Sequence, residues 1–346
     1  MKAEFAKFNR RCGGSAAASV SYFIRFYDES RPDAFGVGEC TVVPGVSAEY
    51  ADVAAYEAKL HELCAQVARG ESTDLMEFSS IMYGFENAIT DFSNGCRRIY
   101  YNTPFVAGRQ VVPVVGFASV GDDPEATARQ VAGLAAEGCT AVKLGMTAGD
   151  CAPVAEALTL IRRQCPELHI RLDANGLLRP DEALGFINGL ARHTIQCIEQ
   201  PIAAGQLDAM AAICAASKVP VALSDELAGV VNPMAMLQLL RTVKPHVLCV
   251  KPALCGGFSN AVHWLKMSAQ LNLGCWIASA GETAVGLDAL CQWTAMMQPR
   301  IAQELLPDGA ACSGHSPLRF GKNTIGRDSA GVTPDCIGYF NPDWQQ

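Results

Sequence analysis

Three acidic residues and a lysine recur at a constant interval along this chain. Asp173, Glu199, Asp225 and Lys251 follow one another at steps of 26 residues, and each ends a short apolar run. A strand, a turn, a helix and a return turn together occupy roughly this many residues in a parallel β/α barrel. We therefore expect the four side chains at one level, at the carboxyl ends of neighbouring parallel strands, where such barrels place their chemistry.

The chain beyond Val111 is expected to alternate between strands and helices. Apolar runs predict strands at about 112–119, 139–144, 169–173, 195–199, 221–225, 247–251 and 274–278. Helical periodicity fills the intervals at 124–137, 152–164, 180–192, 207–217, 233–243, 258–272 and 282–297. Pro124 fits the first turn of its helix and Asp123 is a candidate N-cap. Seven strand-helix pairs are thus predicted, and no eighth pair is visible after Met297.

Residues 1 to about 108 follow a different pattern. Val20–Tyr27 alternates apolar and polar residues like a half-buried antiparallel strand, and Ala34–Thr41 is predicted as a second strand. Ala48–Arg69 and Phe85–Gly95 carry helical periodicity. We expect an α+β module ahead of the barrel, to which the Gly- and Pro-rich C-terminal tail returns.

Composition narrows the class of protein. Half of the 346 residues are apolar and the net charge is −8, which argues against nucleic acid as a partner. No apolar run reaches about 18 residues, so no membrane span is expected. The N-terminus lacks an apolar signal core, which predicts a cytoplasmic protein. The 15 cysteines include no CxxC pair and are interpreted as buried hydrophobic residues in a reducing compartment.

The three carboxylates predict a metal site. Converging carboxylates repel one another unless a cation lies between them. Oxygen ligands on rigid strand ends suit Mg²⁺, with Mn²⁺ as a substitute, rather than zinc. One acidic residue at a strand end is commonly a helix N-cap, but three at equal spacing, followed by a lysine, favour the metal.

Lys143 is expected to belong to the same ring, because it ends the predicted second strand. The alternative is a surface lysine whose stem lies along apolar residues. Lys143 and Lys251 would flank the metal, and the cation should depress the pKa of both. A lysine base beside a cation that holds a carboxylate suggests removal of a proton next to that carboxylate, with the metal stabilising the resulting dianion.

Eight segments, in this order and spacing, resemble the muconate-lactonizing subgroup of the enolase superfamily over nearly the whole chain. They are GVGECTVVPGVS (Gly36–Ser47), ENAITDF (Glu86–Phe92), AVKLG, RLDAN, IEQP, LSDE, CVKPA and IASAGETAVG (Ile277–Gly286). The resemblance implies an α/β fold: a modified (β/α)7β TIM barrel over residues 109–314. It also implies an α+β capping domain of residues 1–108, completed by about 315–346.

The resemblance further implies roles for single residues. Asp173, Glu199 and Asp225 become the Mg²⁺ ligands, and Lys143 and Lys251 the catalytic pair on either side of the substrate. Asn175 is expected to support the site from behind these ligands. Expected substrate-binding residues are Ser279, Glu282, Thr283, Gly13 and Gly14. The last two lie in the Gly13–Ala18 loop, which in the family closes over the substrate; an ordinary mobile loop is the open alternative.

One position departs from the subgroup. Its members usually carry Lys-x-Lys at the end of the second strand, and Ala141 stands here in place of the first lysine. Loss of this neighbouring charge should leave Lys143 more basic. It should also weaken contacts to a substrate carboxylate.

Within the subgroup, Ile277–Ala295 resembles o-succinylbenzoate synthases, the dehydratases of menaquinone synthesis. The implied partner is a small-molecule carboxylate, 2-succinyl-6-hydroxy-2,4-cyclohexadiene-1-carboxylate, which loses water in a syn elimination. Gly309–Leu318 lacks the Asp-x-Asp with which epimerases hold an α-ammonium group. Two alternatives stay open: an N-acylamino acid racemase or dipeptide epimerase, and a non-catalytic ligand-binding barrel. The oligomeric state also stays open.

Overall fold

The computed structural model describes five stretches of the chain, and the statements below refer to them. These are residues 1–10, 19–147, 151–306, 316–328 and 342–346. Among the helices in these stretches, none combines the length and the apolar character that crossing a bilayer requires.

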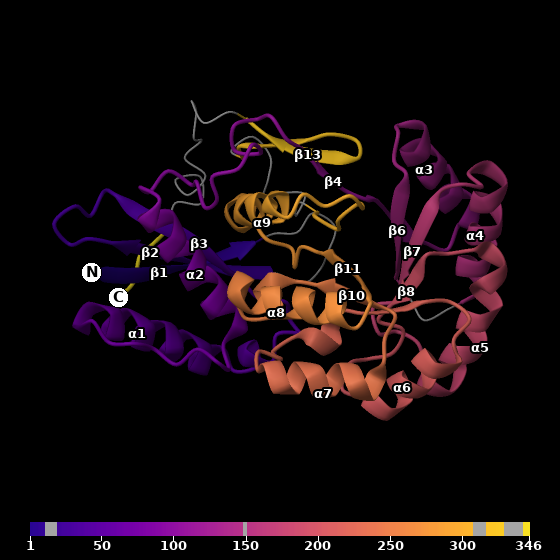
Figure 1. The fold of residues 1–346 in the computed structure, drawn as a ribbon, viewed down its shortest axis with the longest axis horizontal. Coiled ribbons are helices and arrows are strands. Elements are labelled where there is room, and N and C mark those ends of the chain that lie inside the picture. The colour runs from indigo at the N-terminus through magenta and orange to yellow at the C-terminus, as the bar shows by residue number, and fades with distance from the viewer. Residues whose placement is uncertain (11–18, 148–150, 307–315, 329–341) are drawn as a thin grey trace.

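The N-terminal module is an antiparallel sheet covered by two helices (Figure 1). Strands β1 (Lys2–Arg10), β2 (Ser19–Tyr27) and β3 (Phe35–Thr41) form the sheet in that order. Helices α1 (Val53–Arg69) and α2 (Ser79–Ser93) follow. The two predicted strands are confirmed, β1 was not predicted, and α2 begins six residues before the predicted Phe85.

Glycines let α2 lie directly on β3. A Cβ atom at Gly38 would lie 1.8 Å from the carbonyl oxygen of Gly84, and one at Gly36 would lie 2.1 Å from that of Ala88. The two backbones therefore approach more closely than any larger residue would permit. This contact fixes the helix against the sheet and joins both to one apolar core that includes Phe5.

Seven parallel strands form a curled sheet in sequence order, as predicted. They are β5 (Gly116–Val120), β6 (Ala141–Met146), β7 (His169–Asp173), β8 (Cys197–Glu199), β9 (Val221–Leu223), β10 (Val247–Val250) and β11 (Gly274–Ile277). The predicted helices alternate with them as α3 (Pro124–Ala136), α4 (Ala152–Gln164), α5 (Pro180–Leu190), α6 (Leu207–Ala216), α7 (Pro233–Val243), α8 (Gly257–Gln270) and α9 (Ala284–Met296). Asp123 caps α3, since its carboxylate accepts a hydrogen bond from the Ala126 amide at 3.0 Å.

A two-residue segment connects the edges of this sheet. Gln303 bridges to Val114, just before β5, and Glu304 bridges to Ala278, just after β11, both in parallel orientation. Backbone bonds from Gln303 N to Pro113 O (2.8 Å) and from Glu304 N to Ile277 O (2.9 Å) hold the segment. Residues 303–304 thus take the place of an eighth strand that showed no periodic signal in the sequence.

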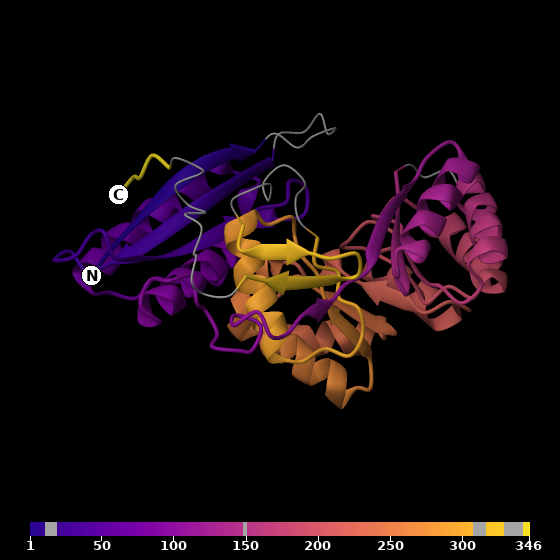
Figure 2. The same ribbon diagram turned by 90° about the horizontal axis from the view of Figure 1, so that it is seen from above.

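The predicted strand at 112–119 is divided between two sheets. Only β5 belongs to the parallel sheet, whereas β4 (Val112–Pro113) pairs with β13 (Thr324–Arg327), which pairs with β12 (Leu318–Phe320). Figure 2 shows the β12–β13 pair beside α9. The last residues lie elsewhere: Gln345 forms a bridge with Phe5 on β1, so both chain ends lie at the N-terminal module (Figure 1).

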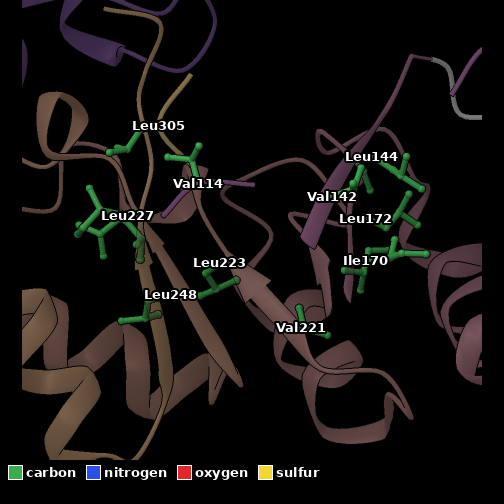
Figure 3. Packing of buried hydrophobic residues seen from close by; sticks show 14 of the residues in the cluster. Val114, Val142, Leu144, Ile170, Leu172, Val221, Leu223, Leu227, Leu248 and Leu305 are labelled. Atoms are coloured by element: carbon green, nitrogen blue, oxygen red, sulfur yellow. The ribbon is translucent and has the colours of Figure 1, made fainter. Parts of the chain in front are cut away.

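Alternate residues of the parallel strands face the helices and the lumen. Val142, Leu144, Ile170 and Leu172 point from β6 and β7 into the main core beneath the helices (Figure 3). A separate buried cluster fills the lumen, and it consists of Cys197, Ala222, Val247, Cys249, Trp276 and Ala278. The outward-facing residues of each strand pack against the helices. The inward-facing polar side chains at the strand ends therefore project into the lumen.

Candidate active site

Neighbouring strands bring the first two predicted carboxylates together. Asp173 and Glu199 end β7 and β8 and lie opposite each other in the sheet register. Lys143, on β6, reaches both, with its Nζ atom 2.9 Å from Asp173 Oδ2 and 2.7 Å from Glu199 Oε2. The prediction that Lys143 belongs to this ring is consistent with these contacts, since its side chain is buried among carboxylates.

Asp225 and Lys251 form the other half of the site. Asp225 was predicted to end its strand, but β9 ends at Leu223 and Asp225 begins a short 3-10 turn, where its Oδ1 lies 3.3 Å from Lys251 Nζ. Gln200, at a positive φ of 40°, fixes this turn because its side-chain oxygen accepts the amide of Asp225 at 3.0 Å. The two lysines therefore contact different carboxylates: Lys143 contacts Asp173 and Glu199, and Lys251 contacts Asp225.

Glu304, which the sequence interpretation missed, completes the cluster. Its Oε2 lies 2.7 Å from Lys143 Nζ, and its Oε1 accepts a hydrogen bond from Arg171 Nη1 at 2.9 Å. Arg171 also donates to the carbonyl of Ala302, and its guanidinium lies 3.7 Å from the centre of the Trp276 ring. All of these side chains are buried, so a cation pairs with each oxygen of a carboxylate that water does not reach.

Burial and charge act in opposite directions on the pKa values of the cluster. Burial alone lowers the pKa of Lys143, but Glu199, Glu304 and Asp173 raise it well above its ordinary value. Burial also has the largest single effect on the pKa of Lys251, which it lowers, but Asp225 and Glu199 together with the other nearby groups raise the pKa above its ordinary value. The predicted depression of both values assumed a bound cation; the carboxylates by themselves have the reverse effect.

A cavity of about 380 Å³ opens at the carboxyl ends of the strands. Its lining combines the cluster with apolar groups: Phe117, Ala118, Ser119, Gln130, Lys143, Gly145, Asp173, Asn175, Lys251, Ala278, Ser279, Glu304 and Leu306. Both lysines thus face one space that is large enough for a small carboxylate.

The remaining predicted residues lie in different surroundings. Asn175 lines the cavity, and its side chain donates to the carbonyl of Met146 at 2.9 Å. Ser279 lines the cavity and accepts the amide of Leu306 at 2.9 Å. Glu282 and Thr283 are fully buried outside the lining.

Thr283 is bonded to the N-terminal module. Its hydroxyl donates to Glu39 on β3 at 2.6 Å. Gly13 and Gly14 fall outside the described residues. Their role, like the substrate contacts of Ser279, Glu282 and Thr283, stays a prediction.

The residues of the site fit a hard divalent cation. Asp173 and Glu199 converge on one positive group, the Lys143 ammonium. Asp225, just after the next strand, offers a third carboxylate that contacts Lys251, and the oxygens of these three carboxylates do not all lie within 4.8 Å of one another. Cys249 lies deeper, with Glu199 and Glu304. Burial and the neighbouring carboxylates raise the pKa of its thiol well above the usual range. Most donors of the site are therefore carboxylate oxygens, which hard cations prefer to sulfur.

The fold and the site define a parallel α/β barrel-like protein with carboxylates and two lysines at the carboxyl ends of its strands. Residues 126–335 match the family model described as enolase C-terminal domain-like. The chain belongs to the enolase superfamily, a superfamily of enzymes.

The relatives of this chain include proteins named as o-succinylbenzoate synthases, as a racemase and as epimerases. The chain is 32% identical to an o-succinylbenzoate synthase of Desulfotalea psychrophila over 257 residues, 74% of this chain and 69% of the relative. It is 25% identical to an N-succinyl-L-Arg/Lys racemase of Bacillus cereus over 178 residues, 51% of this chain and 47% of the relative. The crystal structure of MenC from Desulfotalea psychrophila is similar at a TM-score of 0.79 and 25% identity, covering 94% of this chain and all of that one.

Proposed function

We propose that the protein is an o-succinylbenzoate synthase. It would dehydrate 2-succinyl-6-hydroxy-2,4-cyclohexadiene-1-carboxylate to 2-succinylbenzoate in menaquinone biosynthesis. The observation that carries the proposal is the pair of lysines, Lys143 and Lys251, on different carboxylates at one cavity. The 32% identity to a synthase of that name gives it further support.

Asp173, Glu199 and Asp225 would hold Mg²⁺, or Mn²⁺ in its place. The bound cation would offset the carboxylates that now hold the pKa of Lys143 high, and would stabilise negative charge on the substrate carboxylate. Asn175 would support this end of the cavity, and Ser279 is proposed as a substrate contact because it lines the same space.

Lys143 would perform both proton transfers on one face of the ring. Its neutral amine removes the proton next to the ring carboxylate, and the C–H electron pair delocalises toward that carboxylate. The resulting ammonium gives the proton to the departing hydroxyl as the C–O bond breaks, so that water leaves and the ring becomes aromatic. Lys251, held by Asp225, would remain a cation on the other face.

We also propose that residues 1–108, with the tail, form the capping domain over the barrel of residues 109–314. The separate apolar core of the N-terminal module and the bridge from Gln345 to Phe5 support this division. Residues 318–327 are an exception within the tail, because they pair with each other and with β4 and so lie on the barrel side. A cytoplasmic location remains a prediction from the sequence.

The primary test is loss of the substrate diene absorbance in the presence of Mg²⁺. Wild-type protein is expected to consume the cyclohexadiene and to stop when EDTA is added. N-succinyl amino acids and dipeptides serve as competing substrates in the same assay series. A protein that racemizes one of these with kcat/KM well above its value for the diene would not be a synthase.

A second candidate function is N-succinyl amino acid racemization or dipeptide epimerization. It is favoured by the relatives named for these activities. A two-base racemase needs Lys251 as a base, whereas the dehydratase needs it only as a cation. Lys251→Arg should therefore retain measurable dehydration but stop racemization, because arginine stays protonated at neutral pH. Deuterium incorporation from D₂O into each enantiomer of an N-succinyl amino acid reports the second reaction.

A further inference from the structure

Within the described stretches, three carboxylates contact Lys143, and Glu304 is the one that the proposed metal site does not use. Asp173, Glu199 and Glu304 each lie within 2.9 Å of the lysine Nζ atom. A cation that binds Asp173 and Glu199 draws two of these three carboxylates away from the ammonium. Lys143 then keeps a single anionic partner among its present contacts.

The surroundings of Glu304 hold its carboxylate in one place. Arg171 bonds to Oε1 and is itself held at three further points: Gln196 Oε1 at 2.9 Å, the carbonyl of Ala302 at 2.9 Å and the face of Trp276. The backbone of Glu304 is hydrogen-bonded to Ile277 and Ser279. A carboxylate with a fixed backbone and a fixed guanidinium partner can present its other oxygen at a constant position.

We propose that Glu304, backed by Arg171, is a positioning residue that holds Lys143 while Asp173 and Glu199 bind the cation. The inference rests on the proposed function in taking Lys143 as the proton-transfer group. It has two consequences. Glu304 gives the ammonium a partner other than the metal ligands, so it favours cation binding. It also keeps the Nζ atom in line with the substrate proton, so it favours turnover.

Glu304→Gln removes this function with little change in shape. Each carboxylate oxygen now faces a cation, so the amide NH₂ of glutamine must point at either Arg171 or Lys143. Mn²⁺ affinity, measured by calorimetry without substrate, should fall roughly 10- to 100-fold, as when partners behind metal ligands are removed. With saturating metal, kcat for the diene should also fall at least about tenfold while KM stays within about twofold, because Glu304 positions the base and not the substrate.

A double-mutant cycle separates this role from a general effect of charge. If Glu304 acts through Lys143, Glu304→Gln should change Mn²⁺ affinity by no more than about twofold in a Lys143→Met background. An equal loss of affinity in both backgrounds overturns the proposal, as does wild-type affinity or wild-type kcat in the single variant. If E304Q does not fold, Glu304→Asp replaces it; the shorter side chain cannot span both cations, and the same outcomes decide.

Asp288→Asn is the matched control. Asp288 is also a buried carboxylate paired with an arginine, Arg327, at 2.9 Å, but it lies on α9 outside the cavity lining. The Asp288→Asn variant should have a lower Tm than the wild type and an unchanged Mn²⁺ affinity. Failure of the proposed function remains distinguishable: a wild type that leaves the diene unchanged refutes the synthase, whereas the substrate-free affinities still test Glu304.

Discussion

Glu39 connects the N-terminal module to the barrel through several hydrogen bonds. It is fully buried on β3, and its carboxylate accepts hydrogen bonds from the Thr283 hydroxyl (2.6 Å), the Thr283 amide (3.0 Å) and the Gly286 amide (2.9 Å) at the start of α9. Ser21 donates to its other side at 2.6 Å. A buried anion with four donors at a helix N-terminus should contribute strongly to stability.

Glu39→Gln keeps the volume and removes the charge. The glutamine NH₂ can turn toward the Ser21 hydroxyl, which is able to accept, while the carbonyl oxygen keeps the three donors from α9. Three charge-assisted bonds then become neutral ones, each weaker by about 1 kcal/mol. We expect the free energy of unfolding to fall by about 2–3 kcal/mol, measured by urea denaturation.

Glu49→Gln provides the comparison for Glu39→Gln. Glu49 is half-buried in the same module and accepts the Ser80 amide at 3.1 Å. Glu49→Gln should lower the free energy of unfolding by less than about 1 kcal/mol. Equal losses in the two variants would show that the buried carboxylate on β3 does not anchor α9.

Two further predictions concern single carboxylates. Asp225→Asn should weaken Mg²⁺ binding, measured by calorimetry, and lower turnover by roughly 10²-fold or more, whereas Asp208→Asn on the exposed start of α6 should change neither. Burial raises the pKa of Glu86, which accepts the amides of Phe258 and Ser259. The folded state therefore binds the Glu86 proton more tightly than the unfolded state does. The stability gained from this protonation is present at low pH and is lost as pH rises from 4.5 through the raised pKa. Glu86→Gln should flatten the fall in stability over that range, and an unchanged pH profile of urea midpoints would refute this reasoning.

The repeating units were predictable because each strand is buried on both faces. An apolar run that ends in a polar residue, such as the one before Asp173, marks a parallel strand and its end at once. The constant interval then indicated which strand ends are neighbours, and Asp173 and Glu199 do lie opposite each other. Local sequence and sheet geometry required the same arrangement, so no tertiary information was needed.

β1 was missed because its charges have partners only in the folded chain. Glu4 is buried in this strand, where it pairs with Arg25 of β2 and accepts a hydrogen bond from Tyr27 at 2.8 Å. Lys7 pairs with Glu57 of α1 at 2.8 Å. Read alone, the alternation of charged and apolar residues does not reveal which charges are neutralised.

Glu304 was missed for a different reason. Two residues are too few to produce periodicity, so the segment that connects the sheet edges has no strand signal. The interval itself contained the missing information, since two more steps of 26 from Lys251 reach Ile277 and Gln303. The first position ends β11 and the second lies beside Glu304.

The lumen is arranged in layers, and this arrangement explains how a buried cluster of charges coexists with a stable fold. Inward-facing residues lie two apart on each strand, so a strand places one residue in the apolar layer and the next in the charged layer. Cys197 and Glu199 do this on β8, and Cys249 is followed by Lys251 after β10. Arg171 joins the layers, since its guanidinium lies on Trp276 below and bonds to Glu304 above. The apolar layer excludes water beneath the carboxylates, which strengthens their attraction for the lysines and, by the same physics, for a divalent cation.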